Sequence, residues 1–225
     1  MASKNESKRQ KKLAKQRQKA KRALQRKKQE IELPTDGKHL AEYVLNPKKL
    51  TTPRMIDENV KVFCEAINPN TAPTFLEIDP EEWSRQSCCD LNVKHYLEKH
   101  GGGVMVCGYK IWYRTKLYIE AERQAVLRTD DGTLRDLTFA ADGETRVLFL
   151  PDTPDRSHNL SDNRDKIRHA VDHRVKSLAE SLDRRDAKNP IQRLSDDESW
   201  ARMLTFADWK SGERQASVWL TTKSR

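Results

Sequence analysis

The first 28 residues carry too much positive charge and too little apolar surface to contribute to a folded core. They contain 13 Lys or Arg and a single acid, Glu6, which gives a net charge of +12. The whole 225-residue chain has a net charge of +9, so the rest of the chain carries −3. Only this slightly acidic remainder can form a compact body. Charge asymmetry of this kind is typical of a tail that binds nucleic acid.

The basic arm, residues 1–30, is expected to be disordered alone and helical when phosphates neutralise it, because helix formers dominate it and like charges repel. It has no aromatic side chain for base stacking, so salt-sensitive, weakly sequence-specific binding to RNA, a ribosome or DNA is predicted. A solubilising tail and a localisation signal remain alternatives, and the lack of a large apolar face argues against membrane binding. The predicted nucleic-acid-binding residues are Lys8, Arg9, Lys11, Lys12, Lys15, Arg17, Lys19, Lys21, Arg22, Arg26, Lys27 and Lys28.

The cysteines indicate a reducing compartment. There are four, none of them in a CxxC pair, which is too few for a disulfide scaffold in a chain of this length. No run of about 18 apolar residues indicates a membrane span, and no apolar segment typical of a secretory signal follows the basic N-terminus. The sequence therefore predicts a cytoplasmic protein with reduced thiols, and it indicates no cofactor.

The middle of the body has the composition of an antiparallel sheet. Aromatic and β-branched residues fill four segments, and Asp-Asp-Gly and Ala-Asp-Gly turn signals separate the last three of them. Apolar residues at helical spacing predict helices before and after these strands. The predicted fold is therefore α+β, with helices flanking a roughly four-stranded antiparallel meander. The expected strands are 104–114, 117–128, 134–139 and 146–150, and the expected helices are 38–45, 55–67, 81–100, 162–186 and 196–209.

These patterns predict that the chain has three parts: the basic arm 1–30, an α+β domain 31–152 and a C-terminal helical extension 153–225. The helix predicted for 162–186 carries an apolar stripe that suits packing on the sheet or pairing with a second copy as a homodimer. The aromatic residues near the C-terminus are expected to form the core of the C-terminal helices, with an exposed partner-binding patch as the alternative. They are Trp200, Phe206, Trp209 and Trp219.

Two adjacent cysteines lie where the third helix is expected to start. Ser87 is a suitable N-cap for a helix that begins at Cys88, which places Cys88 and Cys89 in the first turn. The positive end of the helix macrodipole lowers the pKa of a thiol placed there and favours the reactive thiolate. A cysteine nucleophile also needs a base, usually a His that an Asp or Asn orients.

Short segments between residues 83 and 152 follow one another in a distinctive order. Together they resemble a little-characterised bacterial and phage domain of cysteine-peptidase-like (papain-like) cast. The resemblance covers under a third of the chain, and this chain lacks the Cys-rich zinc tail of some members of the family. The segments include Cys89-Asp90-Leu91-Asn92-Val93, His100-Gly101-Gly102, Gly108-Tyr109-Lys110-Ile111-Trp112, Ile119-Glu120-Ala121-Glu122, Ala125-Val126, Asp136-Leu137-Thr138 and Arg146-Val147-Leu148-Phe149-Leu150-Pro151-Asp152.

The resemblance implies a catalytic Cys, His and Asp, which fall on Cys89, Gln124 and Asp136. Gln124 stands where the His is expected and cannot accept a proton from a thiol. If the turn between the two strands has three residues, Gln124 and Asp136 share one face of the hairpin. Helix geometry turns His95 away from Cys89 and places His100 too far along the axis. The domain is therefore expected to be a pseudoenzyme or to have altered chemistry.

A metal site is the weaker interpretation of the same residues. Cys88, His95 and Cys107 lack the tight spacing of structural zinc sites. The acids Glu120, Glu122 and Asp136 lie beside Arg123 and Arg135, which favours ordinary ion pairs. His169 and His173, which lie beside acids, are expected to be surface residues. The sequence therefore predicts no metal.

Three functions remain open at this point. The first is a non-catalytic protein that binds RNA, a ribosome or DNA through its arm and uses the body for further contacts with protein or nucleic acid. The second is an active cysteine hydrolase, a peptidase or deamidase, which the arm directs to its target. The third is a phage or plasmid factor that inhibits a host complex through the acidic body.

Overall fold

The computed structural model describes residues 14–16, 18, 31–153, 166–188, 191–192, 194–215 and 220–221. Its elements are α2 (Gly37–Val44), α3 (Glu58–Ile67), β1 (Thr74–Glu77), α4 (Cys89–His100), β2 (Val104–Arg114), β3 (Tyr118–Arg128), β4 (Leu134–Arg135), β5 (Arg146–Pro151), β6 (Lys166–Ala170), the 3-10 helix η2 (His173–Val175), α5 (Lys176–Lys188), β7 (Ile191–Gln192), α6 (Asp196–Arg202), α7 (Phe206–Ser211) and β8 (Leu220–Thr221). The α+β class and the antiparallel sheet are confirmed.

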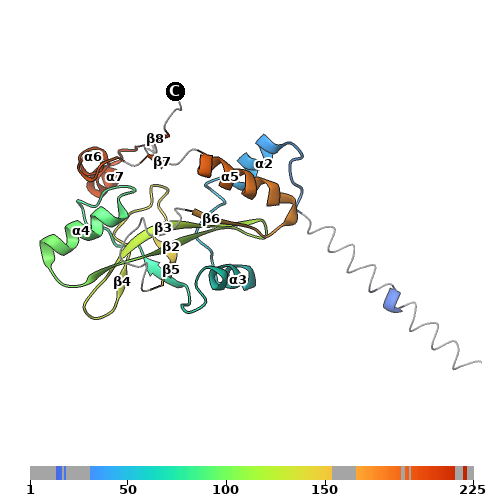
Figure 1. Ribbon diagram of the computed structural model, residues 1–225, viewed down its shortest axis with the longest axis horizontal. Coiled ribbons are helices and arrows are strands. Elements are labelled where there is room, and N and C mark those ends of the chain that lie inside the picture. The colour runs from blue at the N-terminus through green and yellow to red at the C-terminus, as the bar shows by residue number, and fades with distance from the viewer. Residues whose placement is uncertain are drawn as a thin grey trace, which may run out of the picture.

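The sheet is built on the long β2–β3 hairpin (Figure 1). Its eleven residue pairs run from Val104–Arg128 to Arg114–Tyr118 without a bulge. The strand order is β1-β5-β2-β3-β4, and β6 pairs with β3. This order departs from the expected meander, because β5 pairs with β2 and with β1, which the sequence analysis missed, and not with β4. The strand expected at 134–139 is regular only at Leu134–Arg135.

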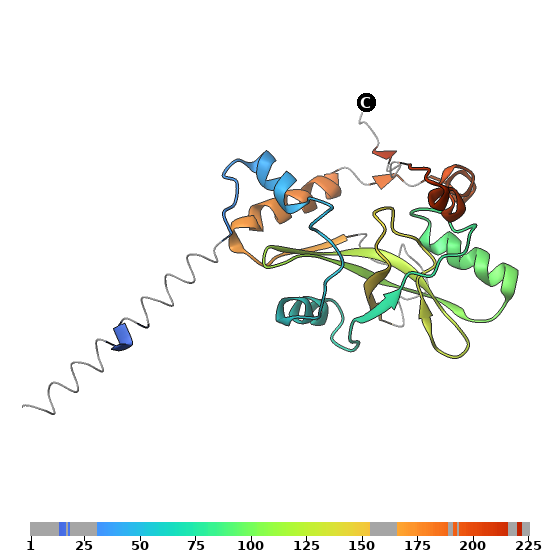
Figure 2. The same cartoon turned by 180° about the vertical axis from the view of Figure 1, so that it is seen from behind.

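Helices cover both sides of this hairpin (Figures 1 and 2). Helix α3 packs on a core cluster that includes Tyr109, Ile111 and Ile119, whereas α4 packs near Leu127 and Leu137 through Val93. In the views, α3 lies on one side of the hairpin and α4 and α5 lie on the other.

Helix α3 begins three residues later than expected. The carboxylate of Asp57 accepts a hydrogen bond from the backbone N–H of Val60 at 3.0 Å and so caps the helix at its N-terminus. Ile56, which the periodicity placed on the buried stripe, precedes this cap and is 41% exposed. Cys64 is buried in the core cluster, as its position on the stripe predicts.

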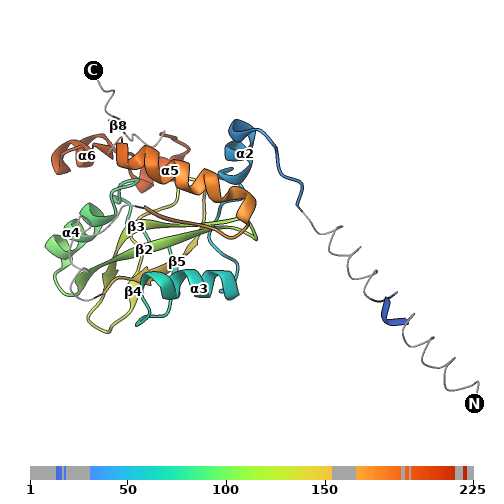
Figure 3. The same ribbon diagram turned by 45° about the vertical axis from the view of Figure 1, so that its right-hand side comes forward.

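The helix expected at 162–186 is replaced by β6, η2 and α5, with 162–165 outside the described residues. Residues 166–170 pair with 118–122 of β3, so this segment belongs to the sheet and not to a separate extension. Helix α5 packs with α2 around Val44, Leu117 and Val175 (Figure 3). The apolar stripe that suggested a homodimer is therefore covered within the same chain.

Arg168 joins this edge strand to α5. Its side chain is 4% exposed, and it forms ion pairs with Glu120 at 3.0 Å and with Asp183 at 2.8 Å. Glu120 also pairs with Lys166 at 2.7 Å. These charged side chains lie on β3, β6 and α5. They form ion pairs because residues 166–170 adopt a strand beside β3 in place of the expected helix.

The C-terminal segment forms two helices where one was expected. The side chain of Thr205 accepts a hydrogen bond from the N–H of Asp208 and starts α7 separately from α6. Phe206 and Trp209 pack around Phe139 with ring centroids 5.4 and 5.7 Å from it. Trp200 packs on the body at Trp83, so the aromatic residues join the C-terminal helices to the α+β body. Trp219 lies outside the described residues. No described helix combines the length and apolar composition needed to cross a bilayer.

Replacing Gly108 by Ala is expected to destabilise the protein by about 1–3 kcal/mol, because the site has no room for a methyl group. A Cβ atom at this position would lie 2.6 Å from Phe149 Cζ and 2.9 Å from Pro151 Cα. The matched control is Gly37→Ala, where nothing lies within 4 Å of the new atom. Urea unfolding should show a loss for Gly108→Ala alone, and equal stability of the two variants would contradict the packing argument.

Candidate functional site

The candidate site is centred on the start of α4. This helix begins at Cys89, and its N-cap is Cys88, which makes no side-chain capping hydrogen bond. The predicted N-cap, Ser87, has φ 59° and lies outside the helix, and residues 81–88 form turns and not the predicted helix. The cause is Asn92, which is fully buried and bonds to both the N–H and the C=O of Arg85. The chain before Cys89 is thereby folded back on the helix.

The structure brings Cys89, Gln124 and Asp136 into one region. Cys89 packs with Cys107 and Ala125, the residue after Gln124. The side-chain amide of Gln124 donates hydrogen bonds to the two carboxylate oxygens of Asp136 at 3.0 and 3.1 Å. The expected shared face of the hairpin is therefore present, and Gln124 occupies it as a hydrogen-bond donor.

The thiol of Cys89 is not activated by its position in the helix. Burial raises its pKa far above the usual range, and the carboxylates of Asp90 and Asp136 raise it further. Burial also raises the pKa of Cys88 to about 12. The expectation that the macrodipole favours a thiolate is wrong here, because the loss of solvation outweighs the attraction of the helix terminus.

Asp136 is also perturbed by burial. Its side chain is fully buried, and desolvation raises its pKa to about 6 although Lys110, Thr138 and Gln124 act in the opposite direction. The N–H of Thr138 donates to this carboxylate at 2.9 Å. Asp136 therefore binds a proton more readily than an exposed aspartate does.

No described histidine lines the site. His95 lies between Trp83 and Trp200, with ring centroids 4.5 and 4.8 Å away. His100 lies against Tyr96 at the far end of α4. His169 is on β6 and contacts Phe63 on the other side of the sheet. Gln124 therefore has no histidine substitute among the described residues, whereas His158 lies outside them.

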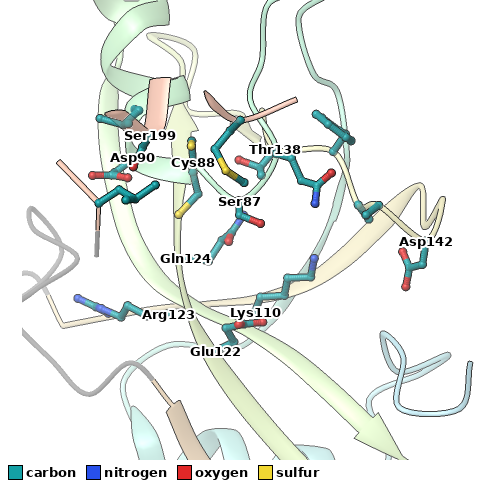
Figure 4. A pocket seen from close by; sticks show the side chains of 18 of the residues that line it. Ser87, Cys88, Asp90, Lys110, Glu122, Arg123, Gln124, Thr138, Asp142 and Ser199 are labelled. Carbon is teal, nitrogen blue, oxygen red and sulfur yellow. The ribbon is translucent and has the colours of Figure 1, made fainter. Parts of the chain in front are cut away.

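A cavity of about 390 Å³ opens beside these residues (Figure 4). The start of α4, the middle of β2 and β3, the loop after Asp136 and the C-terminal segment enclose it. The sequence analysis identified Cys89 and Gln124 in its lining but missed Lys110, Trp112 and the C-terminal contribution from Met203. Strand alternation places Lys110 and Trp112 on the same face as Gln124, which was the available signal.

The predicted arm residues are almost all outside the described part of the chain. Lys15 is described, lies in a helical turn and is exposed. The remaining predicted contacts, Lys8, Arg9, Lys11, Lys12, Arg17, Lys19, Lys21, Arg22, Arg26, Lys27 and Lys28, lie outside the described residues.

The carboxylates that sequence analysis considered for a metal form ion pairs instead. Glu120 and Glu122 both pair with Lys166. Arg123 pairs with Asp152 at 2.8 Å, and both side chains are buried. Within the described ranges, no group of three His, Cys, Asp or Glu side chains is placed to hold a metal ion.

Comparison of the chain with models of known families, with curated proteins and with solved structures gave no match. The resemblance to a cysteine-peptidase-like domain therefore rests on the sequence segments that suggested it.

The stability of the wild type relative to Asp136→Asn is expected to fall by about 3 kcal/mol as pH rises from about 3 to about 7. The folded-state pKa of Asp136, about 6, exceeds the usual value of 3.8. The folded state therefore binds the proton more tightly, and its contribution to stability is complete at low pH and lost above the folded-state pKa. Urea unfolding across this range measures the difference, and a constant difference would contradict the assignment.

Iodoacetamide is expected to alkylate Cys88 and Cys89 in the folded protein far more slowly than a free thiol at neutral pH. Both sulfur atoms are buried, and both pKa values are raised. Peptide mass spectrometry after native labelling measures each rate, and labelling in denaturant provides the reference. Faster labelling of Cys89 in the folded chain would identify an activated nucleophile and overturn this interpretation.

Proposed function

We propose that the protein is a non-catalytic nucleic-acid-associated protein. The basic arm tethers it to RNA, a ribosome or DNA, and the body is a degenerate cysteine-hydrolase-like scaffold that makes further contacts with protein or nucleic acid. The observation that carries the proposal is the segregation of charge, +12 in residues 1–28 against −3 in the rest of the chain. Electrostatic attraction to a polyanion therefore belongs to the arm, because the body as a whole repels phosphate.

The site supports binding over hydrolysis. A cysteine hydrolase needs a base that removes the thiol proton, and the amide of Gln124 cannot act as one. That amide instead donates to Asp136 and occupies the carboxylate that would orient a histidine. The raised pKa of Cys89 further lowers the thiolate population at neutral pH. Each of these features removes one requirement of nucleophilic catalysis.

The alternative of an active cysteine hydrolase has one observation in its favour. Cys89 begins a helix beside a cavity and lies in the same region as Asp136, as the resemblance implies. The alternative requires a proton acceptor at the cavity, and replacement of Cys89 by Ala would then abolish the activity. The non-catalytic proposal predicts the same nucleic-acid binding for Cys89→Ala as for the wild type.

Deletion of residues 2–28 is expected to abolish salt-sensitive binding to RNA and duplex DNA. Each phosphate contact adds about −0.9 to the slope of log Kobs against log[salt] for duplex DNA, so the intact arm should give a steep dependence. Fluorescence anisotropy across a salt series measures the affinity and the slope for both chains.

Two full-length variants separate charge from the mere presence of the arm. A variant with every Lys of residues 1–28 replaced by Arg should retain the slope, because the charge is kept. A variant with every Lys and Arg of this segment replaced by Gln should behave like the deletion. Unchanged affinity and slope in the deletion chain would refute tethering by the arm.

A further inference from the structure

The cavity beside α4 contains a buried cation without a matching anion. Lys110 is 8% exposed, and its Nζ atom lies 4.3 Å from the ring centroid of Trp112. Within the described part of the chain this Nζ atom forms neither a hydrogen bond nor an ion pair, whereas the backbone of Lys110 belongs to the sheet. Figure 4 shows its side chain extending into the cavity, whereas the guanidinium of Arg123 points away from it. The ammonium of Lys110 is thus presented to whatever occupies the space.

Most other charges around the cavity are already matched; Asp142 also lines it, and its carboxylate has no ion pair among the described residues. Arg123 pairs with Asp152 at 2.8 Å. Glu122 accepts a hydrogen bond from Trp112 Nε1 at 2.9 Å and pairs with Lys166. Asp90 and Asp196 share Lys94, at 3.4 and 3.2 Å. Lys110 is therefore the described lining cation that remains available to an incoming anion.

Asp136 does not replace such an anion. Lys110 acts to lower the pKa of Asp136, but the Asp136 carboxylate is held by Gln124 and by the N–H of Thr138. No ion pair joins it to Lys110 within the described residues. Burial of an ammonium without a paired anion carries a free-energy cost in lost hydration, and the opening of Lys110 onto the cavity reduces this cost without removing it. An anion that enters the cavity would recover part of this free energy.

The lining selects the charge and shape of the anion. One ammonium balances a single negative charge, and Asp142, the lining acid without an ion pair among the described residues, disfavours a dianion such as phosphate. The apolar part of the wall includes Trp112, Phe139 and Met203. A volume of about 390 Å³ is in the range of small-molecule sites. These properties fit a carboxylate attached to an apolar body.

We propose that this cavity binds a small organic monocarboxylate, whose carboxylate pairs with Lys110 and whose apolar body packs against Trp112, Phe139 and Met203. The proposal is independent of the arm, since the residues that carry it belong to the described body. It adds a small-molecule binding activity to the proposed tethering function, and neither depends on a reactive Cys89.

The test uses the full-length chain with methyl-¹³C methionine and benzoate as the probe. Met203 lines the cavity, whereas Met55 is 68% exposed and lies outside the cavity lining. Benzoate should shift the Met203 methyl resonance in a saturable manner and leave Met55 unchanged. Benzamide, which has nearly the same shape without the charge, should bind about tenfold more weakly or worse. Met203→Leu assigns the resonance.

Lys110→Met should weaken benzoate binding about tenfold or more and bring it close to that of benzamide. The matched control is Lys61→Met on α3, which removes one exposed positive charge outside the cavity and should leave the affinity unchanged. If Lys110→Met does not fold, the comparison of benzoate with benzamide on the wild type decides alone.

Three results would overturn the proposal. They are no shift of Met203 with benzoate, equal binding of benzoate and benzamide, and tighter binding of inorganic phosphate than of benzoate. The last result would identify a phosphate site. None of these outcomes depends on nucleic-acid binding, so the failure of this proposal and the failure of tethering by the arm are distinguishable.

Discussion

The β2–β3 ladder is the constraint on which the rest of the body depends. Eleven uninterrupted residue pairs fix which side chains point to each face, and a shift by one residue would exchange the two faces. The ladder also positions its neighbours, because β5 pairs with one of its edges and β6 with the other. Gly108 allows the approach of β5, since a side chain there would meet the backbone of Pro151. This register also determines which side chains line the cavity, and it places Lys110 directly opposite Glu122.

Buried polar contacts attach the remaining segments to this ladder. Asn92 bonds to Arg85 and to Thr138 Oγ1, so one amide holds both the turn before α4 and the loop after Asp136. The Arg123–Asp152 pair joins β3 to the end of β5 in a buried setting. Breaking a buried ion pair by removing one partner typically costs about 3–5 kcal/mol, because the other charge is left uncompensated. These contacts give the start of α4 one defined position against the sheet.

The elements that could be predicted from the sequence are those specified by local pattern. Alternating aromatic and β-branched residues identify β2 and β3, and the three-residue turn correctly places Gln124 beside Asp136. The helix predicted at 162–186 is present from Lys176 as α5, and the prediction is wrong for residues 166–170 because Ile167 and Val171 suit a strand as well as a helix. The strand is favoured by the ion pairs of Arg168 with Glu120 on β3 and with Asp183 on α5, which a local sequence pattern does not reveal. The four-residue strand β1 also requires a distant partner, β5, and leaves little local signal.

The pKa values of the side chains at the site depend on how deeply each one is buried, and a local sequence pattern does not predict burial of this kind. A cysteine at a helix start suggests a lowered pKa, yet the packing around Cys89 reverses the direction. Likewise, Lys110 indicates an anion-binding site only in the folded chain, where its side chain is largely buried and lies against Trp112. Helix α6 and Met203 also line the cavity. Their segment is held against the loop before α4 by a hydrogen bond that the Gln86 N–H donates to the Leu204 carbonyl. Such contacts between remote segments cannot be inferred from periodicity.

The two sources of positive potential differ in how salt acts on them. The arm concentrates many cations in a segment with few apolar residues, so the proposed attraction to phosphates would depend on counterion release and weaken steeply as salt increases. Lys110 is a single buried charge, and its interaction with an anion in the cavity is screened far less. Raising the salt concentration therefore suppresses the first interaction before the second. Under the two proposals, the same chain would dissociate from a polyanion while its cavity still held a small monoanion, because the two interactions are screened by different surroundings.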